Sequence, residues 1–226
     1  DDDFSYLFEN GKVSLGLRRS LNSLLDDKND TEHKKQNVMT FFSYKGGVGR
    51  TTSLALTATY LARQGKNIFV IDCDLEAPGL LNFFNSAQSG KQKSGLVEYL
   101  NDQLFAKSNN NMDDYIYNIE KDYSGSGTIN LMASGNIISE DPKDLGDYLE
   151  GLARLDLQGI GLINVFSSLI DEIQNKYNPN VILIDSRTGF NNLFGTLVKL
   201  SKNIVILAGD DVQNQPGTDY VSRLLS

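Results

Sequence analysis

The sequence has few of the residues that build disulfide-linked, metal-clustered or membrane-spanning proteins. Its 226 residues include one cysteine, one histidine, four prolines and no tryptophan. A single thiol, Cys73, excludes an internal disulfide and a cysteine-only metal cluster, and is typical of a reducing compartment. No apolar run approaches the roughly 20 residues that a membrane-spanning helix needs. We therefore expect a cytoplasmic protein without a membrane span.

Basic residues are also fewer than acidic residues. The chain has 29 acidic and 21 basic residues, which gives a formal net charge of −8 at pH 7. Nucleic acids and anionic membranes attract proteins with an excess of Lys and Arg, so this balance argues against either partner for this fragment. The lone His33 lies in a charged tract, where a solvated side chain is favoured over a ligand or a general base.

The chain divides into a polar beginning and a core domain. Residues 1–37 form an appendage in which Val13–Leu25 could be one amphipathic helix. Residues 38–226 form the core domain, and 40% of the whole chain is hydrophobic, enough for a substantial core. Because the chain begins without methionine and stops in an apolar-periodic stretch, we expect it to be part of a longer protein.

Short apolar runs alternate with helical patterns in the core domain. The expected strands are Val38–Ser43, Asn67–Asp72, Ile129–Met132, Val181–Asp185 and Asn203–Leu207. The expected helices are Thr51–Gln64, Gly95–Leu104, Ile160–Tyr177 and Asn191–Ser201, with another beginning near Thr218. This alternation predicts an α/β fold, with a mostly parallel sheet flanked by helices on both faces. The polar tracts 85–94 and 106–128 are expected to be surface loops or mobile insertions.

The stretch "YKGGVGRT", residues 44–51, lies between an expected strand and an expected helix. A glycine-rich turn at a helix N-terminus presents backbone N–H groups that bind phosphate. The stretch keeps the second glycine and the hydroxyl of the pattern G-x-x-x-x-G-K-[ST], but not its first glycine or its lysine. A glycine-rich turn without a ligand is the alternative.

The whole string resembles the deviant phosphate loop K-G-G-x-G-K-[ST]-[ST] of the ParA/MinD family of SIMIBI-class P-loop ATPases. Lys45 matches the signature lysine of that family, which by resemblance crosses a dimer interface to the nucleotide of the partner. Arg50 replaces the usual lysine, as in a subgroup with the motif K-G-G-V-G-R. Guanidinium keeps the charge but changes the geometry of phosphate binding.

The resemblance implies ATP and Mg²⁺ as cofactors. The expected nucleotide-binding residues are Lys45, Gly46, Gly47, Val48, Gly49, Arg50, Thr51 and Thr52. Thr51 would supply a hydroxyl ligand to magnesium, and Thr52 would lie beside the α-phosphate.

Aspartates end two of the expected strands, where hydrolysis would need them. By resemblance, Asp74 of "DCD" positions the attacking water, and Asp72 supports the magnesium shell or the loop. Asp185 of "DSRTG" fits the carboxylate that binds a magnesium-bound water. Asp72 and Asp74 could instead only cap the strand and begin a turn. The catalytic residues we predict are Lys45, Arg50 and Asp74, and the metal-binding residues are Thr51, Asp72 and Asp185.

Other residues near these motifs have open roles. Glu76, Pro78 and Gly79 belong to a segment expected to respond to the γ-phosphate. Arg187 could touch phosphate or a partner subunit, or could be a surface arginine. The segment Asp211–Pro216 could contact adenine or could be a connecting loop.

The resemblance therefore implies an ATPase that acts as a nucleotide-controlled homodimerisation switch, together with fused domains or a further protein partner. One alternative is an ATP-sensing module with little hydrolysis in a bacterial defence or signalling assembly. A DNA-partitioning ATPase or a P-loop tyrosine kinase is a third. The acidic charge argues against the former, and no tyrosine-rich tail supports the latter.

Overall fold

A computed structural model gives the fold. It describes residues 8–9, 12–13, 35–84, 94–106, 111–135, 137, 142–155, 162–210 and 215–225. Within these ranges, no helix is long and apolar enough to cross a membrane.

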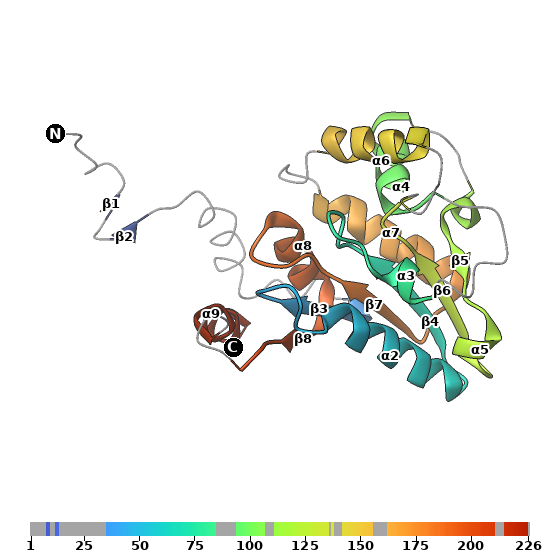
Figure 1. Ribbon diagram of the computed structural model, residues 1–226, viewed down its shortest axis with the longest axis horizontal. Coiled ribbons are helices and arrows are strands. Elements are labelled where there is room, and N and C mark those ends of the chain that lie inside the picture. The colour runs from blue at the N-terminus through green and yellow to red at the C-terminus, as the bar shows by residue number, and fades with distance from the viewer. Residues whose placement is uncertain are drawn as a thin grey trace.

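One six-stranded sheet forms the centre of the fold (Figure 1). Its strands are β3 (Lys35–Ser43), β4 (Asn67–Asp72), β5 (Tyr117–Asn118), β6 (Thr128–Met132), β7 (Val181–Asp185) and β8 (Ser201–Leu207). They lie in the order β5-β6-β4-β7-β3-β8, and all neighbouring pairs are parallel except β5 with β6. A separate antiparallel pair joins β1 (Phe8–Glu9) to β2 (Lys12–Val13).

Helices cover both faces of the sheet, because the central strands are apolar on both sides. The helices on one face are α2 (Arg50–Arg63), α3 (Leu80–Phe83) and α5 (Lys121–Ser124). Those on the other face are α4 (Leu96–Asn101), α6 (Pro142–Arg154), α7 (Leu162–Tyr177) and α8 (Asn192–Leu200). The remaining helix, α9 (Gln215–Leu225), packs Val221 against Phe42 and Phe194. The predicted α/β class with a mostly parallel sheet is confirmed.

Strand β4 explains how one short segment supports two hydrophobic cores. Successive side chains of a strand point to opposite faces. Ile68 and Val70 therefore pack with the cluster under α2, whereas Phe69 and Ile71 pack with the cluster under α7. All four side chains are buried, so β4 is fixed between the two layers, and its end at Asp72 is fixed with it.

The predicted bounds of β4 and β7 are confirmed to the residue, and other elements differ at their ends. Strand β3 begins at Lys35 rather than Val38, and the polar side chain of Lys35 binds Asp171 of α7 at 2.7 Å. The helix expected over Gly95–Leu104 is α4, followed directly by a π-helical turn, η3 (Asp102–Ala106). The helix expected over Val13–Leu25 falls outside the described residues except for Val13, which ends β2.

The prediction that 106–128 is a surface loop or mobile insertion is wrong for much of this tract. It contains a 3-10 turn, η4 (Met112–Tyr115), as well as β5 and α5. The apolar side chains of Met112, Tyr115 and Ile116 are buried in the core, although polar residues dominate the local composition. The other tract, 85–94, lies outside the described residues except for Ser94.

Substitutions of Gly127, directly before β6, and Gly146, in α6, compare a closely packed backbone position with an open one. A Cβ atom at Gly127 would overlap the carbonyl oxygens of Lys66 and Ala62, whereas one at Gly146 in α6 would meet open space. We expect Gly127→Ala to lower the free energy of unfolding by about 1–3 kcal/mol. The matched change Gly146→Ala should raise it by about 0.5–1 kcal/mol, because alanine favours a helix. Urea unfolding followed by circular dichroism measures both, and equal effects would contradict this packing.

Candidate functional site

The strand order brings the three predicted motifs to one edge of the sheet. Strand β7 lies between β4 and β3, and all three are parallel, so their carboxyl ends are neighbours. Asp72 and Asp185 are register partners in β4 and β7, and Phe41 of β3 is the partner of Asp185 on the other side. Strand β3 ends at Ser43, two residues after Phe41, and the glycine loop of residues 44–49 begins directly after it, so the loop lies close to the carboxylates at the ends of β4 and β7.

The loop between β3 and α2 depends on glycine. Gly47 and Gly49 have φ angles of 78° and 83°, in the left-handed region that strains other residues. No atom lies within 4 Å of a Cβ built at Gly46, Gly47 or Gly49, so the backbone borders open space. The 14-residue helix α2 begins directly after Gly49, and its first backbone N–H groups have no partner within the helix. The loop can therefore approach an anion closely.

A cavity of about 530 Å³ lies over this loop. Its lining residues come from the loop, the start of α2 and the segments after β4 and β7: Ser43, Gly46, Gly47, Gly49, Arg50, Thr51, Thr52, Asp74, Glu76, Ala77, Arg187 and Thr188. It thus brings together residues from distant parts of the sequence, such as Ser43 and Thr188.

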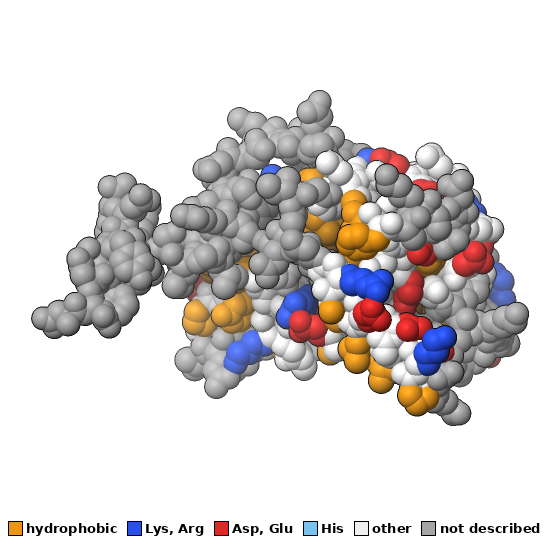
Figure 2. All heavy atoms as spheres, turned by 90° about the horizontal axis from the view of Figure 1, so that it is seen from above, with side chains coloured by type: hydrophobic (Ala, Val, Ile, Leu, Met, Phe, Trp, Pro, Cys, Tyr) orange, Lys and Arg blue, Asp and Glu red, His pale blue; other side chains and the backbone are white. Residues whose placement is uncertain are grey.

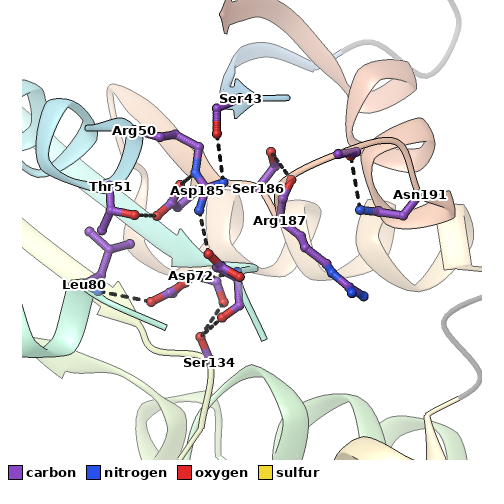
Figure 3. A network of polar contacts seen from close by, with 12 residues as sticks. Ser43, Arg50, Thr51, Asp72, Leu80, Ser134, Asp185, Ser186, Arg187 and Asn191 are labelled. Atoms are coloured by element: carbon purple, nitrogen blue, oxygen red, sulfur yellow. Dashed lines mark hydrogen bonds and ion pairs between the residues drawn. The ribbon is translucent and has the colours of Figure 1, made fainter. Parts of the chain in front are cut away.

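Arg50 connects all three strand ends (Figure 3). Its Nε donates a short hydrogen bond to Asp185 of β7, and Nη2 donates to Asp74 after β4 at 2.6 Å. Its Nη1 donates to the hydroxyl of Ser43, the last residue of β3, at 3.3 Å. Arg50 is only 6% exposed, so the guanidinium is the buried counter-charge of two carboxylates. A lysine, with one compact ammonium group, cannot reproduce this three-armed contact.

Thr51 and Asp185 form the pair predicted to bind a metal. The Thr51 hydroxyl donates to Oδ2 of Asp185 at 2.6 Å, while Arg50 occupies Oδ1 of the same carboxylate. Burial raises the pKa of Asp185, and the charge of Arg50 and the bond from Thr51 oppose this rise. The carboxylate is therefore held in place from both sides.

These donors fit magnesium only together with a phosphate ligand. Mg²⁺ is commonly bound by one or two side chains plus substrate phosphates and water. Thr51 and Asp185 offer a hydroxyl and a carboxylate at the helix N-terminus, beside the cavity. In the described part of the chain, no group of three or more His, Cys, Asp and Glu side chains could hold a metal by itself. The arrangement fits a metal that arrives with its nucleotide.

Asp72, which ends β4, and Asp74, which follows it, have different contacts. The carboxylate of Asp72 accepts hydrogen bonds from the backbone N–H groups of Asp74 (3.1 Å) and Leu80 (3.2 Å). Burial, together with the neighbouring charge of Asp185, raises the pKa of Asp72 to about 7. These contacts hold the loop between β4 and α3. A place for Asp72 in a metal shell stays a prediction, whereas Asp74 lines the cavity.

Glu76 and Arg187 form an ion pair in the wall of the cavity. They lie in the segments that follow β4 and β7, and the Arg187 guanidinium pairs with the Glu76 carboxylate at 2.6 Å. Both side chains are substantially exposed, so the pair contributes little to stability. The pair connects Glu76, in the segment expected to respond to the γ-phosphate, with Arg187, whose role the sequence left open.

The remaining predicted residues are placed around the loop. Lys45 and Val48 are partly buried, and Thr52 is exposed and lines the cavity. Cys73 is fully buried, and burial raises its pKa, so it is a core side chain rather than a reactive thiol. The segment Asp211–Pro216, the candidate for adenine contact, lies outside the described residues except for Gln215 and Pro216. These two residues begin α9 and are exposed.

Sequence reasoning missed three residues that hold the site. Ser43 accepts a hydrogen bond from Arg50, Ser134 binds the backbone after β4, and Tyr148 binds the carbonyl oxygen of Leu75. The position of Ser43, directly before the loop, is a signal that could have been used. Ser134 and Tyr148 carry no such signal, because they come from elements far from the motifs in the sequence.

Comparison with known proteins now identifies the family. The family model of the CobQ/CobB/MinD/ParA nucleotide-binding domain matches the sequence over residues 39–203, well over half of the chain. The chain belongs to this family. An uncharacterised ATP-binding protein of Methanocaldococcus jannaschii is 26% identical over 170 residues. That match includes 75% of this chain and 52% of the relative, so the chain spans about half of that protein's length.

Solved structures of the same fold agree with the family assignment. A plasmid partition protein from Borrelia burgdorferi superimposes with a TM-score of 0.59 at 20% identity, covering 85% of this chain and 73% of that chain. The septum site-determining protein MinD from Pyrococcus horikoshii, solved with Mg-ADP, gives a TM-score of 0.57 at 18% identity, covering 84% and 64%. At these identities the likeness shows the fold, and the predicted ParA/MinD-like architecture is confirmed.

Replacing Arg50 tests its role as a buried counter-charge. Arg50→Ala leaves Asp74 and Asp185 without their partner, and we expect the free energy of unfolding to fall by about 3–5 kcal/mol. Arg50→Lys keeps one charge and should cost less. Urea unfolding measures both losses. As a control, Arg154→Ala breaks the exposed pair with Glu150 and should cost about 0–1 kcal/mol. Similar losses for Arg50→Ala and Arg154→Ala would contradict this role.

Proposed function

We propose that this nucleotide-binding domain binds ATP with Mg²⁺, hydrolyses it, and uses the bound nucleotide to control the pairing of two copies within a larger protein or complex. One observation carries the proposal. The glycine loop, the N-terminus of α2 and Asp74 line one cavity, and Arg50 pairs there with both Asp74 and the buried carboxylate of Asp185.

Phosphate binding follows from the donors at the loop. Backbone N–H groups at a helix N-terminus favour anions, and the helix dipole adds to this preference. The three bonds of Arg50 use one N–H on each of its nitrogens, so Nη1 and Nη2 each have a second N–H for phosphate oxygens. Arg50 can therefore bind phosphate while it keeps its hydrogen bonds to both carboxylates.

Hydrolysis would depend on Asp74 and on the pair Thr51 and Asp185. Phosphoryl transfer to water needs a residue that orients the attacking water and groups that stabilise charge on the phosphate oxygens. Asp74 lines the cavity and is held at 2.6 Å from Arg50, which suits the first role. Thr51 and Asp185 would hold Mg²⁺, which supplies positive charge beside the β- and γ-phosphates.

The change Asp74→Asn tests the water-orienting role. The amide keeps the size of the side chain but is a poor acceptor for the proton of water, so we expect phosphate release to fall about 100-fold or more. The affinity for a non-hydrolysable ATP analogue should change by less than about tenfold, because Asp74 is not expected to bind phosphate. Phosphate release and calorimetry measure the two quantities. Asp171→Asn, on the exposed Lys35 pair, is the control, and unchanged turnover in Asp74→Asn would remove the assignment.

We propose that Lys45 contributes to the pairing of two copies. This residue lies at the start of the loop and is partly buried, and it is absent from the described residues that line the cavity of its own chain. A cation beside the loop but outside its own cavity suits contact with the nucleotide of a second copy, as the family resemblance implies. Such a contact would form only when nucleotide is present.

Light scattering with and without nucleotide tests this pairing. With Mg²⁺ and a non-hydrolysable ATP analogue, we expect the wild-type chain to double its mass, because Lys45 then has a phosphate partner across the interface. Lys45→Ala should stay monomeric yet still bind the analogue. Lys66→Ala, a change at an exposed lysine beyond α2, should pair like the wild type. Pairing of Lys45→Ala at wild-type concentrations would exclude the proposed crossing.

An ATP-sensing module with little hydrolysis is the second candidate. It is favoured by the contact of Arg50 with Asp74, because a carboxylate bound to a guanidinium is a weaker partner for water. In this case the wild type would bind nucleotide but release phosphate no faster than Asp74→Asn. DNA partitioning has less support, since acidic and basic side chains are interspersed among the described residues of the face seen in Figure 2.

A further inference from the structure

The carboxylate of Asp74 must be placed accurately for the proposed hydrolysis, and its backbone is held from a part of the fold outside the motifs. On one side, Asp72 binds the N–H groups of Asp74 and Leu80. On the other, the hydroxyl of Ser134 donates to the carbonyl oxygens of Asp72 (3.2 Å) and Asp74 (3.5 Å). Next to these, the hydroxyl of Tyr148 donates to the carbonyl oxygen of Leu75 at 2.5 Å.

Packing holds the side chain of Tyr148, which donates to Leu75, in place. Tyr148 is the buried residue of α6, 4% exposed, and its ring lies so close to Gly135 that a Cβ atom there would overlap it. Burial, with the charge of Glu98, raises the pKa of Tyr148, so the hydroxyl stays protonated and remains a donor at neutral pH. Its position is therefore set by packing rather than by the single hydrogen bond.

Helix α4 ties Ser134 and α6 into the same unit. The backbone N–H of Val97 donates to the carbonyl oxygen of Ser134 at 2.9 Å. The side chain of Asn101 donates to the carbonyl oxygen of Gly151 in α6 at 3.0 Å, and Gly151 leaves little room beside Val97. Ser134 and Tyr148 thus belong to one rigid support that contacts the segment carrying Asp74.

We infer that Tyr148 is a positioning residue for ATP hydrolysis, which acts by holding the Asp74–Leu75 backbone so that the Asp74 carboxylate stays beside Arg50 and the cavity. Ser134 assists it through the two neighbouring carbonyl groups. The inference rests on the proposed ATPase function. A displacement of a reacting group by about 1 Å can cost about 100-fold in rate, so a lost backbone contact can matter without any lost ligand contact.

Tyr148→Phe removes the hydroxyl and keeps the ring. We expect kcat for ATP hydrolysis to fall about tenfold, and KM and the Kd of a non-hydrolysable ATP analogue to stay within about twofold. The affinity for ADP with aluminium fluoride, which mimics the phosphoryl group in transfer, should fall by a factor similar to that of kcat. A residue that only stabilises the fold would lower the melting temperature without this split.

Tyr99→Phe is the matched control. Tyr99 is equally buried, lies in the same core cluster, and donates its hydroxyl to Glu172 at 2.9 Å, away from the cavity. We expect its kcat and aluminium fluoride affinity to match the wild type. Ser134→Ala, a second change in the support, should lower kcat about threefold. It provides the same test if Tyr148→Phe does not fold.

The outcomes separate this inference from the function on which it rests. A wild type that binds no ATP, or binds it without gaining affinity for ADP with aluminium fluoride, overturns the proposed ATPase and the inference with it. A wild type that hydrolyses ATP, with Tyr148→Phe and Ser134→Ala equal to it in kcat and in aluminium fluoride affinity, overturns the inference alone.

Discussion

The guanidinium of Arg50 is the interaction on which the site depends. It is buried beside two carboxylates, and each of its three nitrogens binds the end of a different strand segment. Two buried carboxylates so close together would repel one another and lose their hydration without a shared counter-charge. Arg50 therefore has a structural role besides the phosphate contact that we propose for it. It holds Asp74, at the wall of the cavity, beside the buried Asp185.

The strand order makes this sharing possible. Because β7 lies between β4 and β3, the residues that follow these strands form one continuous edge. The loop after β3 turns into α2, which places Arg50 and Thr51 directly over Asp185. A support made of α4, α6 and Ser134 then fixes the segment after β4 from the other side. The motifs contain the residues that we propose for hydrolysis, and α4, α6 and Ser134 hold the segment that carries Asp74 in place.

The sequence predicts the strands that end in aspartate more accurately than it predicts the surrounding elements. The apolar runs of β4 and β7 stop sharply at Asp72 and Asp185, so their bounds follow from composition alone. Helix α6 begins with proline, contains two glycines and buries only Tyr148, so its pattern is weak. The contacts of Arg50 with both carboxylates, and of Tyr148 with Leu75, depend on the strand order and on packing between distant segments, which local patterns do not encode.

Calorimetric titration of the wild-type chain with Mg²⁺ and a non-hydrolysable ATP analogue measures whether the site binds nucleotide. We expect saturable binding of one nucleotide per chain, with an affinity that falls at least about tenfold in Arg50→Ala, since a charge-assisted contact to phosphate is lost. Folded wild-type protein that gives no binding heat, at several temperatures and at millimolar nucleotide, would contradict this expectation.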